Sequence, residues 1–282
     1  MYDCLRVRMG LGILALLSAG PAVRPSARLA AQIDYRNIDD DRPTLVEDAY
    51  PVERYALELL LFPVRVEREK SGSYVYSVVP EVAYGAWPNV QLGLKAPVTY
   101  VVQGGTGTWG LSGLKLFALY NLTTETRLPA LSMRADLTLP VGGLASDRAR
   151  VTVKGIATRT LGRSRVHLNG AYSFGSDGRP AAAENPDRWW VGLALDRTLP
   201  FRSMLLLAEV VALRPSGAEP VEVNVSAGLR YQVSPTVVFD AGVGRGVRRG
   251  AGPAWFVTFG FSRAMGLAGL IPIKSSAARR RS

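Results

Sequence analysis

The stretch PVEVNVSAGLRYQV, residues 220–233, alternates apolar and polar side chains without a break. An extended chain turns successive side chains to opposite faces, so the pattern predicts a strand with one oily and one polar face. It is far longer than the roughly 5–6 residues of an ordinary strand in a soluble protein. The oily positions are Val221, Val223, Val225, Ala227, Leu229 and Tyr231.

The same period of two recurs along the chain and predicts twelve strands. No helical period of comparable length follows the N-terminal region. Most of these strands are long enough to cross a bilayer at a tilt, which takes about 9–11 residues. They cover residues 53–66, 72–84, 89–101, 109–120, 128–140, 149–161, 164–175, 187–198, 201–213, 220–232, 235–245 and 253–263.

The connections between these strands alternate in length. AWPN, LGRS, LPF and VSPT are tight, whereas VQGGTGT, GGLASDR, GSDGRPAAAENPD, RPSGAEP and GRGVRRGAG are longer. Short turns at one end and longer loops at the other are typical of outer-membrane barrels. We therefore expect an all-β fold, a transmembrane antiparallel up-and-down β-barrel of about twelve strands. The alternative is a secreted soluble sandwich or lipocalin-like barrel, against which strand length and turn asymmetry both count.

The N-terminus has the layout of a secretory signal peptide, and we expect residues 1–31 to be removed. Arg6 and Arg8 precede the short apolar run LGILALLSAGPAV, and small residues follow it. A membrane anchor is the alternative, although the apolar run is short for one. The only cysteine is Cys4, so the exported protein would have no disulfide and no cysteine-based site. Export and the barrel pattern together predict the bacterial outer membrane.

The remaining chain divides into three parts. Residues 32–51 form an acidic segment, residues 52–263 the barrel, and residues 264–282 a basic tail. The acidic segment could fill the barrel as a plug or lie disordered in the periplasm, and we favour the periplasm. The net charge is +11, but the basic residues are scattered, so we expect no nucleic-acid partner. The partners we expect are outer-membrane lipids, a small-molecule solute and the barrel-assembly machinery.

The polar faces of the expected strands place many ionisable side chains in the lumen, with both signs of charge. We expect either a structural network of paired charges or the lining of a solute path. Arg134, Lys154 and His167 lie on neighbouring strands and could form a basic wall. The candidates for lining the lumen are Glu81, Lys95, Arg134, Asp136, Lys154, Arg165, His167, Asp196, Glu222, Arg230 and Asp240, together with Glu58, Lys115, Arg150 and Glu209.

A second alternative is an enzyme, a lipid hydrolase embedded in the membrane. Its catalytic base would have to be His167, the only histidine. A nucleophilic triad needs a serine within hydrogen-bond reach of the imidazole, and attack on lipid needs access from the lipid side. His167 is expected to face the lumen, and no G-x-S-x-G motif is present. We therefore expect no catalytic residues, no cofactor and no metal site.

The stretch DDDRPTLVEDAYPVERYALELLL, residues 39–61, resembles the entry segment of the outer-membrane transporter family named for the meta pathway of phenol degradation. The likeness rests on Arg42, Pro43, Thr44, Asp48, Ala49, Pro51 and Glu58. The resemblance implies a barrel that moves small, often aromatic or hydrophobic, compounds, and it assigns no functional residues. Our leading expectation is a narrow passive channel for small solutes. A sealed structural or adhesive barrel is the first alternative.

Overall fold

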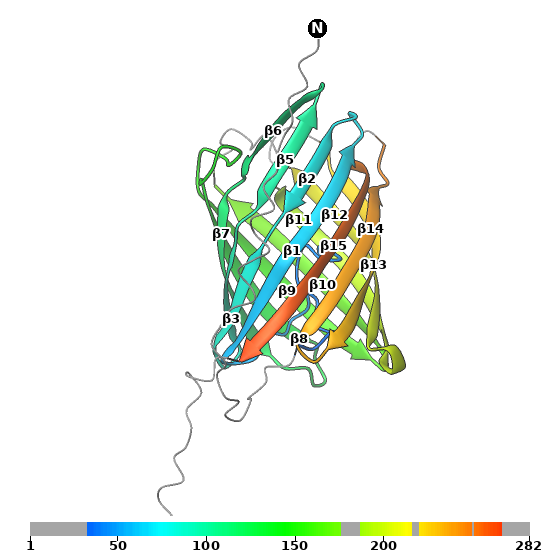
Figure 1. Cartoon of the computed structure of the whole chain (residues 1–282). Helices are drawn as coiled ribbons and strands as arrows, with labels where there is room; N and C mark the ends of the chain where they lie inside the picture. The colour runs from blue at the N-terminus through cyan, green and yellow to red at the C-terminus, as the bar shows by residue number, and fades with distance from the viewer. Residues whose placement is uncertain (1–32, 176–186, 216–219, 250, 267–282) are drawn as a thin grey trace, which may run out of the picture.

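The computed structural model describes residues 33–175, 187–215, 220–249 and 251–266, and these form one closed, twisted sheet (Figure 1). The predicted signal peptide and most of the predicted basic tail lie outside the described residues. The strands are β1 (Ala56–Glu69), β2 (Tyr74–Val78), β3 (Glu81–Trp87), β4 (Val90–Lys95), β5 (Val98–Gln103), β6 (Thr106–Leu111), β7 (Leu114–Thr123), β8 (Ala130–Leu139), β9 (Arg150–Leu161), β10 (Ser164–Phe174), β11 (Asp187–Leu199), β12 (Met204–Pro215), β13 (Glu222–Ser234), β14 (Val237–Gly246) and β15 (Pro253–Gly266). One 3₁₀ turn, η1 (Pro200–Arg202), joins β11 to β12.

All neighbouring strands run antiparallel, and β15 pairs with β1 to close the barrel. Three of the expected strands are each broken in two, into β2 and β3, β4 and β5, and β6 and β7. Two of these breaks hold Pro80 and Pro97, and proline has no N–H to donate to a sheet. With each broken pair counted as one strand, the barrel has twelve strands, as the sequence predicts.

One connection is shorter than the sequence led us to expect. VQGGTGT was assigned to the long loops, but β5 and β6 continue through it and meet at a two-residue turn of Gly104 and Gly105. Both glycines have positive φ, 58° and 83°, which the tight hairpin turn requires and which glycine adopts without steric cost. Among the described residues β6 pairs only with β5, and the β8–β9 loop lies beside it, where Leu144 N–H donates to Leu111 O at 3.1 Å.

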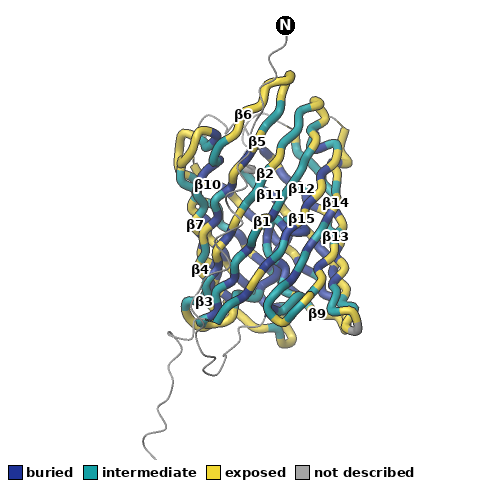
Figure 2. Tube along the Cα trace, in the orientation of Figure 1, coloured by how far each residue is buried: buried dark blue, intermediate teal, exposed yellow. Residues whose placement is uncertain are grey.

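The two faces of the barrel differ as the alternation in residues 220–233 predicts. Exposed large apolar side chains cover the outer face, while buried polar and charged ones gather inside. Figure 2 colours the chain by burial, and buried residues lie among intermediate and exposed ones along the strands. On β10, for example, Leu168 and Tyr172 point outward, whereas Arg165, His167 and Asn169 are buried. In the described part of the chain, none of the helical structure has the length and apolarity that crossing a membrane demands.

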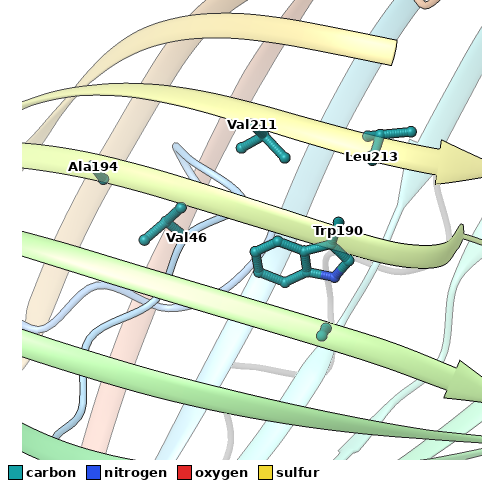
Figure 3. Packing of buried hydrophobic residues seen from close by; sticks show 6 residues of the cluster. Val46, Trp190, Ala194, Val211 and Leu213 are labelled. Atoms are coloured by element: carbon teal, nitrogen blue, oxygen red, sulfur yellow. The ribbon is translucent and has the colours of Figure 1, made fainter. Parts of the chain in front are cut away.

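Residues 33–55, which we call the plug segment, run inside the barrel. Ile33 N–H donates to Pro235 O (3.0 Å) at the short-turn end, and Tyr55 N–H donates to Gly85 O (2.8 Å) at that same end. Between these points the segment reaches the middle of the lumen, where Val46 packs on Trp190 and Val211 (Figure 3). The chain from residue 33 onward thus adopts the plug arrangement and differs from the periplasmic position we favoured. The physical reason is charge: its acids meet buried bases of the wall.

Candidate functional site: a plugged lumen

The central layer of the plug is a cluster of five ionised side chains. Asp40 and Glu47 come from the plug segment, and Lys95, Arg134 and Lys154 come from β4, β8 and β9. Arg134 Nη1 lies 3.0 Å from Asp40 Oδ1 and 2.7 Å from Glu47 Oε2. Lys154 Nζ lies 2.7 Å from Glu47 Oε1 and 3.3 Å from Asp40 Oδ2, and Lys95 Nζ contacts Asp40 directly. All five side chains are buried, so each charge depends on these partners.

A second charged layer ties the plug to the opposite wall. Arg42 of the plug segment pairs with Asp240 of β14 at 3.3 Å. Asp39 pairs with Arg230 of β13 at 3.0 Å. Because the plug supplies the base in one pair and the acid in the other, both signs of charge on β13 and β14 are matched by the plug segment.

The third group contains the histidine. Arg165 of β10 bridges Asp48 of the plug segment (3.2 Å) and Asp196 of β11 (2.7 Å). His167 Nε2 lies 3.0 Å from Asp196 Oδ2, and its Nδ1 lies 3.0 Å from Thr158 Oγ1. With Nε2 protonated, the ring donates to the carboxylate and accepts from the hydroxyl.

Hydrogen bonds with wall side chains also fix the plug backbone. The N–H groups of Leu45 and Val46 donate to the Glu209 carboxylate at 2.9–3.0 Å. The Asn169 side chain both accepts from Glu47 N–H (2.9 Å) and donates to Glu47 O (2.8 Å). Since a buried backbone group without a partner is costly, these wall side chains replace the ladder bonds that an irregular segment lacks.

Two acids of the plug segment have shifted pKa values in opposite directions. Burial alone would raise the pKa of Asp40, but the attraction of Arg134, Lys154 and Lys95 outweighs it and holds that pKa well below its usual range. Burial raises the pKa of Asp48, and the single arginine beside it, Arg165, only partly offsets this effect. The difference follows the number of cations, since three surround Asp40 and one arginine lies beside Asp48.

Two main cavities remain in the lumen, one on each side of the plug. The larger, which we call the vestibule, has about 780 Å³ and opens at the long-loop end, where Ser73, Gln103 and Ser146 line it. The smaller has about 380 Å³ and lies at the short-turn end, beside Tyr50 and Arg163. A further cavity of about 260 Å³ flanks the plug and shares Lys115 with the vestibule.

The structure places every lumen candidate from the sequence on the inner face of the wall, but in different roles. Arg134 and Lys154 face each other across β8 and β9 and bind the plug together, whereas His167 of the supposed basic wall belongs to the separate Asp196 group. Near the central layer, Glu81 pairs with Lys95, and Asp136 pairs with Arg134. The vestibule lining includes Lys115, Arg150 and Glu222, and Glu58 lies at the short-turn cavity.

Sequence reasoning did not assign the plug residues that carry the site. Asp39, Asp40, Arg42, Glu47 and Asp48 were noted only as part of an acidic or family-like segment. One signal in the sequence could have located the plug. Where a strand has glycine at an inward position, the wall leaves room for another part of the chain. At Gly192 of β11 an added Cβ would lie 2.5 Å from Val46 Cγ2, so the wall needs a glycine where the plug approaches it.

Sites for metals or for lipid hydrolysis do not emerge in the described part of the chain. No group of three or more carboxylate, imidazole or thiol side chains there is arranged to hold a metal ion. The Thr158, His167 and Asp196 side chains form a hydrogen-bonded row, but all three are buried beneath the plug, and Thr158 Oγ1 already accepts from Ala49 N–H at 3.0 Å. The row therefore faces neither lipid nor open lumen.

Comparison with solved structures finds outer-membrane barrels. No protein-family model matches the sequence, and no curated protein matches it. The COG4313 outer membrane channel from Pseudomonas putida F1 aligns over 77% of this chain and 98% of its own, with a TM-score of 0.57 and 14% identity. The translocator domain of autotransporter NalP from Neisseria meningitidis covers 75% of this chain and 88% of its own (TM-score 0.50, 9% identity). The KdgM porin covers 74% and 98% (TM-score 0.48, 13% identity). The chain has the fold of outer-membrane β-barrels.

Proposed function

We propose that the protein is a bacterial outer-membrane channel for small solutes, closed in this conformation by the plug segment. The observation that carries the proposal is the position of the plug, which lies between the vestibule and the short-turn cavity and is held by ion pairs to strands on several sides. Charged contacts of this kind can be exchanged for water when a lumen opens, which an apolar plug would resist. A plug of charges therefore suits a barrel that opens.

The outer face supports the location in a membrane. A continuous apolar surface faces outward, and its exposure to water would be unfavourable. Its members include four side chains that are each about half exposed: Leu168, Val191, Leu193 and Phe259. In a bilayer this surface meets acyl chains, and a closed sheet leaves almost no backbone group without a partner.

The vestibule lining bears on the class of solute. Its charged side chains include Lys115, Arg150 and Lys154 on β7 and β9, and Glu67 and Glu222 on β1 and β13. Both signs occur on each side of the barrel, because Asp136 of β8 lies between the basic groups of β7 and β9, and Arg65 stands beside Glu67 on β1. Such a lining favours small polar solutes over the hydrophobic compounds that the family resemblance implies.

The sealed structural barrel is the remaining alternative, because the same ion pairs could close the lumen permanently. Gating and permanent closure differ in one measurable respect: whether the plug has to move for ions to pass. The hydrolase alternative has no comparable support, since His167 is fully buried in the lumen.

A reversible disulfide between the plug and the wall tests the proposal. Val46 Cγ2 lies close to a Cβ built at Gly192, so the pair Val46→Cys and Gly192→Cys can form a disulfide with a small local shift. The only native cysteine, Cys4, is replaced by serine. We expect single-channel conductance in planar bilayers to be absent in the oxidised protein and to appear as discrete steps after reduction.

The controls are the two single-cysteine proteins, whose conductance should not respond to the reductant. Equal conductance before and after reduction of the double variant would show that ions pass without movement of the plug, and it would reject the gate. Silence from the wild type, from the reduced double variant and from a chain beginning at Val52 would favour the sealed barrel, provided that each protein is shown to be inserted and folded.

A further inference from the structure

The outer face carries a row of alternating arginine and aromatic side chains near the long-loop end. Arg68 of β1 is the register partner of Trp255 on β15 and of Tyr74 on β2. On β14, Gly244 pairs with Phe256, so Arg245 stands next to Trp255. Adjacent strands are about 4.8 Å apart, so the two arginine backbones lie roughly 10 Å from each other with a tryptophan between them.

The aromatic members of the row are packed together. The rings of Tyr74 and Trp255 meet edge to face with centroids 6.2 Å apart, and the Arg68 guanidinium lies 5.9 Å from the Tyr74 ring. Arg68 and Arg245 are exposed, and in the described part of the chain neither forms an ion pair. Two cations are thus presented outward on an ordered aromatic support, and no anion within the described ranges neutralises them.

The row lies at the height where lipid headgroups would begin. Below it on β15 the outward residues Val257, Phe259 and Phe261 are all apolar, and the next outward charge is Arg263. From Trp255 to Arg263 the strand rises roughly 27 Å, which a tilt of about 40° reduces to roughly 21 Å along the barrel axis. An outward apolar band of about 25 Å is expected for a membrane barrel, so the row borders the hydrocarbon layer.

We propose that Arg68 and Arg245, with Trp255 between them, bind the phosphate-bearing headgroup of a lipid in the leaflet that surrounds the long-loop end. Arginine donates paired hydrogen bonds to phosphate oxygens, and two arginines at this spacing can hold one headgroup from both sides. The indole fills the space at the boundary between headgroup and acyl chain. The inference rests on the membrane location in the proposed function and is independent of the gate.

Native mass spectrometry of the detergent-solubilised full barrel tests this inference. The probe is a diphosphorylated glycolipid, compared with its dephosphorylated form at equal concentration. We expect the wild type to retain the phosphorylated lipid, and the double variant Arg68→Gln/Arg245→Gln to retain it about tenfold less. Retention of the dephosphorylated lipid should be weak and the same in both proteins.

The matched control is Arg197→Gln/Arg263→Gln, which removes two exposed, outward arginines at the other end of the barrel. An equal loss of lipid in both double variants would show general charge attraction and would overturn the site. Release of the lipid by millimolar inorganic phosphate would show that the row recognises free phosphate, which would also contradict the lipid assignment. The conductance experiment and the lipid experiment have separate readouts. If the conductance experiment rejects the gate but the wild type still retains the phosphorylated lipid, the lipid site is supported and only the gate is rejected.

Discussion

The short-turn half of the barrel and the long-loop half have walls of the same alternating pattern, but one half holds the plug segment and the other holds a cavity. In the short-turn half and the middle, inward arginines and lysines meet acids of the plug segment, as Arg134 meets Asp40 and Glu47. In the long-loop half, inward charges such as Lys115 and Arg150 line a vestibule. Both halves follow the same period of two in sequence. The comparison teaches that alternation identifies the inward face and does not reveal whether that face meets water or another part of the chain.

Replacing Arg134 by methionine should release the plug segment from the wall. Arg134 pairs with Asp40, Glu47 and Asp136 and lies 3.9 Å from the Phe117 ring. Its loss leaves buried carboxylates short of partners, which typically costs about 3–5 kcal/mol. We expect the plug to be displaced, seen as sustained conductance in a planar bilayer and as new protease cleavage within residues 33–55.

Lys115→Met is the control in the other half. It also removes one positive charge from the lumen, but in the described part of the chain Lys115 has no salt bridge to the plug segment, from which the flanking cavity separates it. The plug should stay in place, and only the charge selectivity of open channels should shift toward cations. Equal opening by the two variants would show that overall lumen charge, rather than the contact with the plug, keeps the barrel closed.

Gly192→Leu should weaken the plug by crowding it. A side chain at this inward position would overlap Val46 and would press on Val211 and Trp190, and overpacking typically costs about 1–3 kcal/mol. We expect a higher open probability and an unchanged barrel. The control is Gly170→Leu on the outward face of β10, where nothing lies within 4 Å of an added Cβ and the plug is not touched. Similar conductance of both variants would contradict the close approach of the plug at Gly192.

Mild acid should have the smallest effect on the central layer. The pKa of Asp40 is held well below its usual value near 3.8, and that of Asp41 is also lowered. A lowered carboxyl pKa stabilises the folded form above the unfolded value, and this stabilisation is lost only as pH falls through the folded value. Between pH 7.5 and 5 we therefore expect no increase in open probability. An opening within this range would show that a group other than Asp40 and Asp41 controls the plug.

Much of this molecule is determined locally and can be predicted from sequence. A strand in a barrel needs only its own alternation to choose which side chains face out, because the pleat is a property of each residue and its neighbours. Leu168 and Tyr172 against Arg165 and His167 show this on β10. The tight Gly104–Gly105 turn was also present in the sequence, but the composition of its flanks resembled a loop, and only pairing across β5 and β6 extended the strands.

The position of the plug depends on contacts between distant parts of the chain. Only the tertiary structure decides these contacts. Asp40 meets Lys95, Arg134 and Lys154, which come from three different strands, and no local pattern links them. The same acidic residues would suit a solvated segment equally well, because the acids are stable either in water or against buried bases. What the sequence by itself determined is the wall, since its alternation is local. The closed barrel determined the interior, since only closure brings the bases of several strands around one acidic segment.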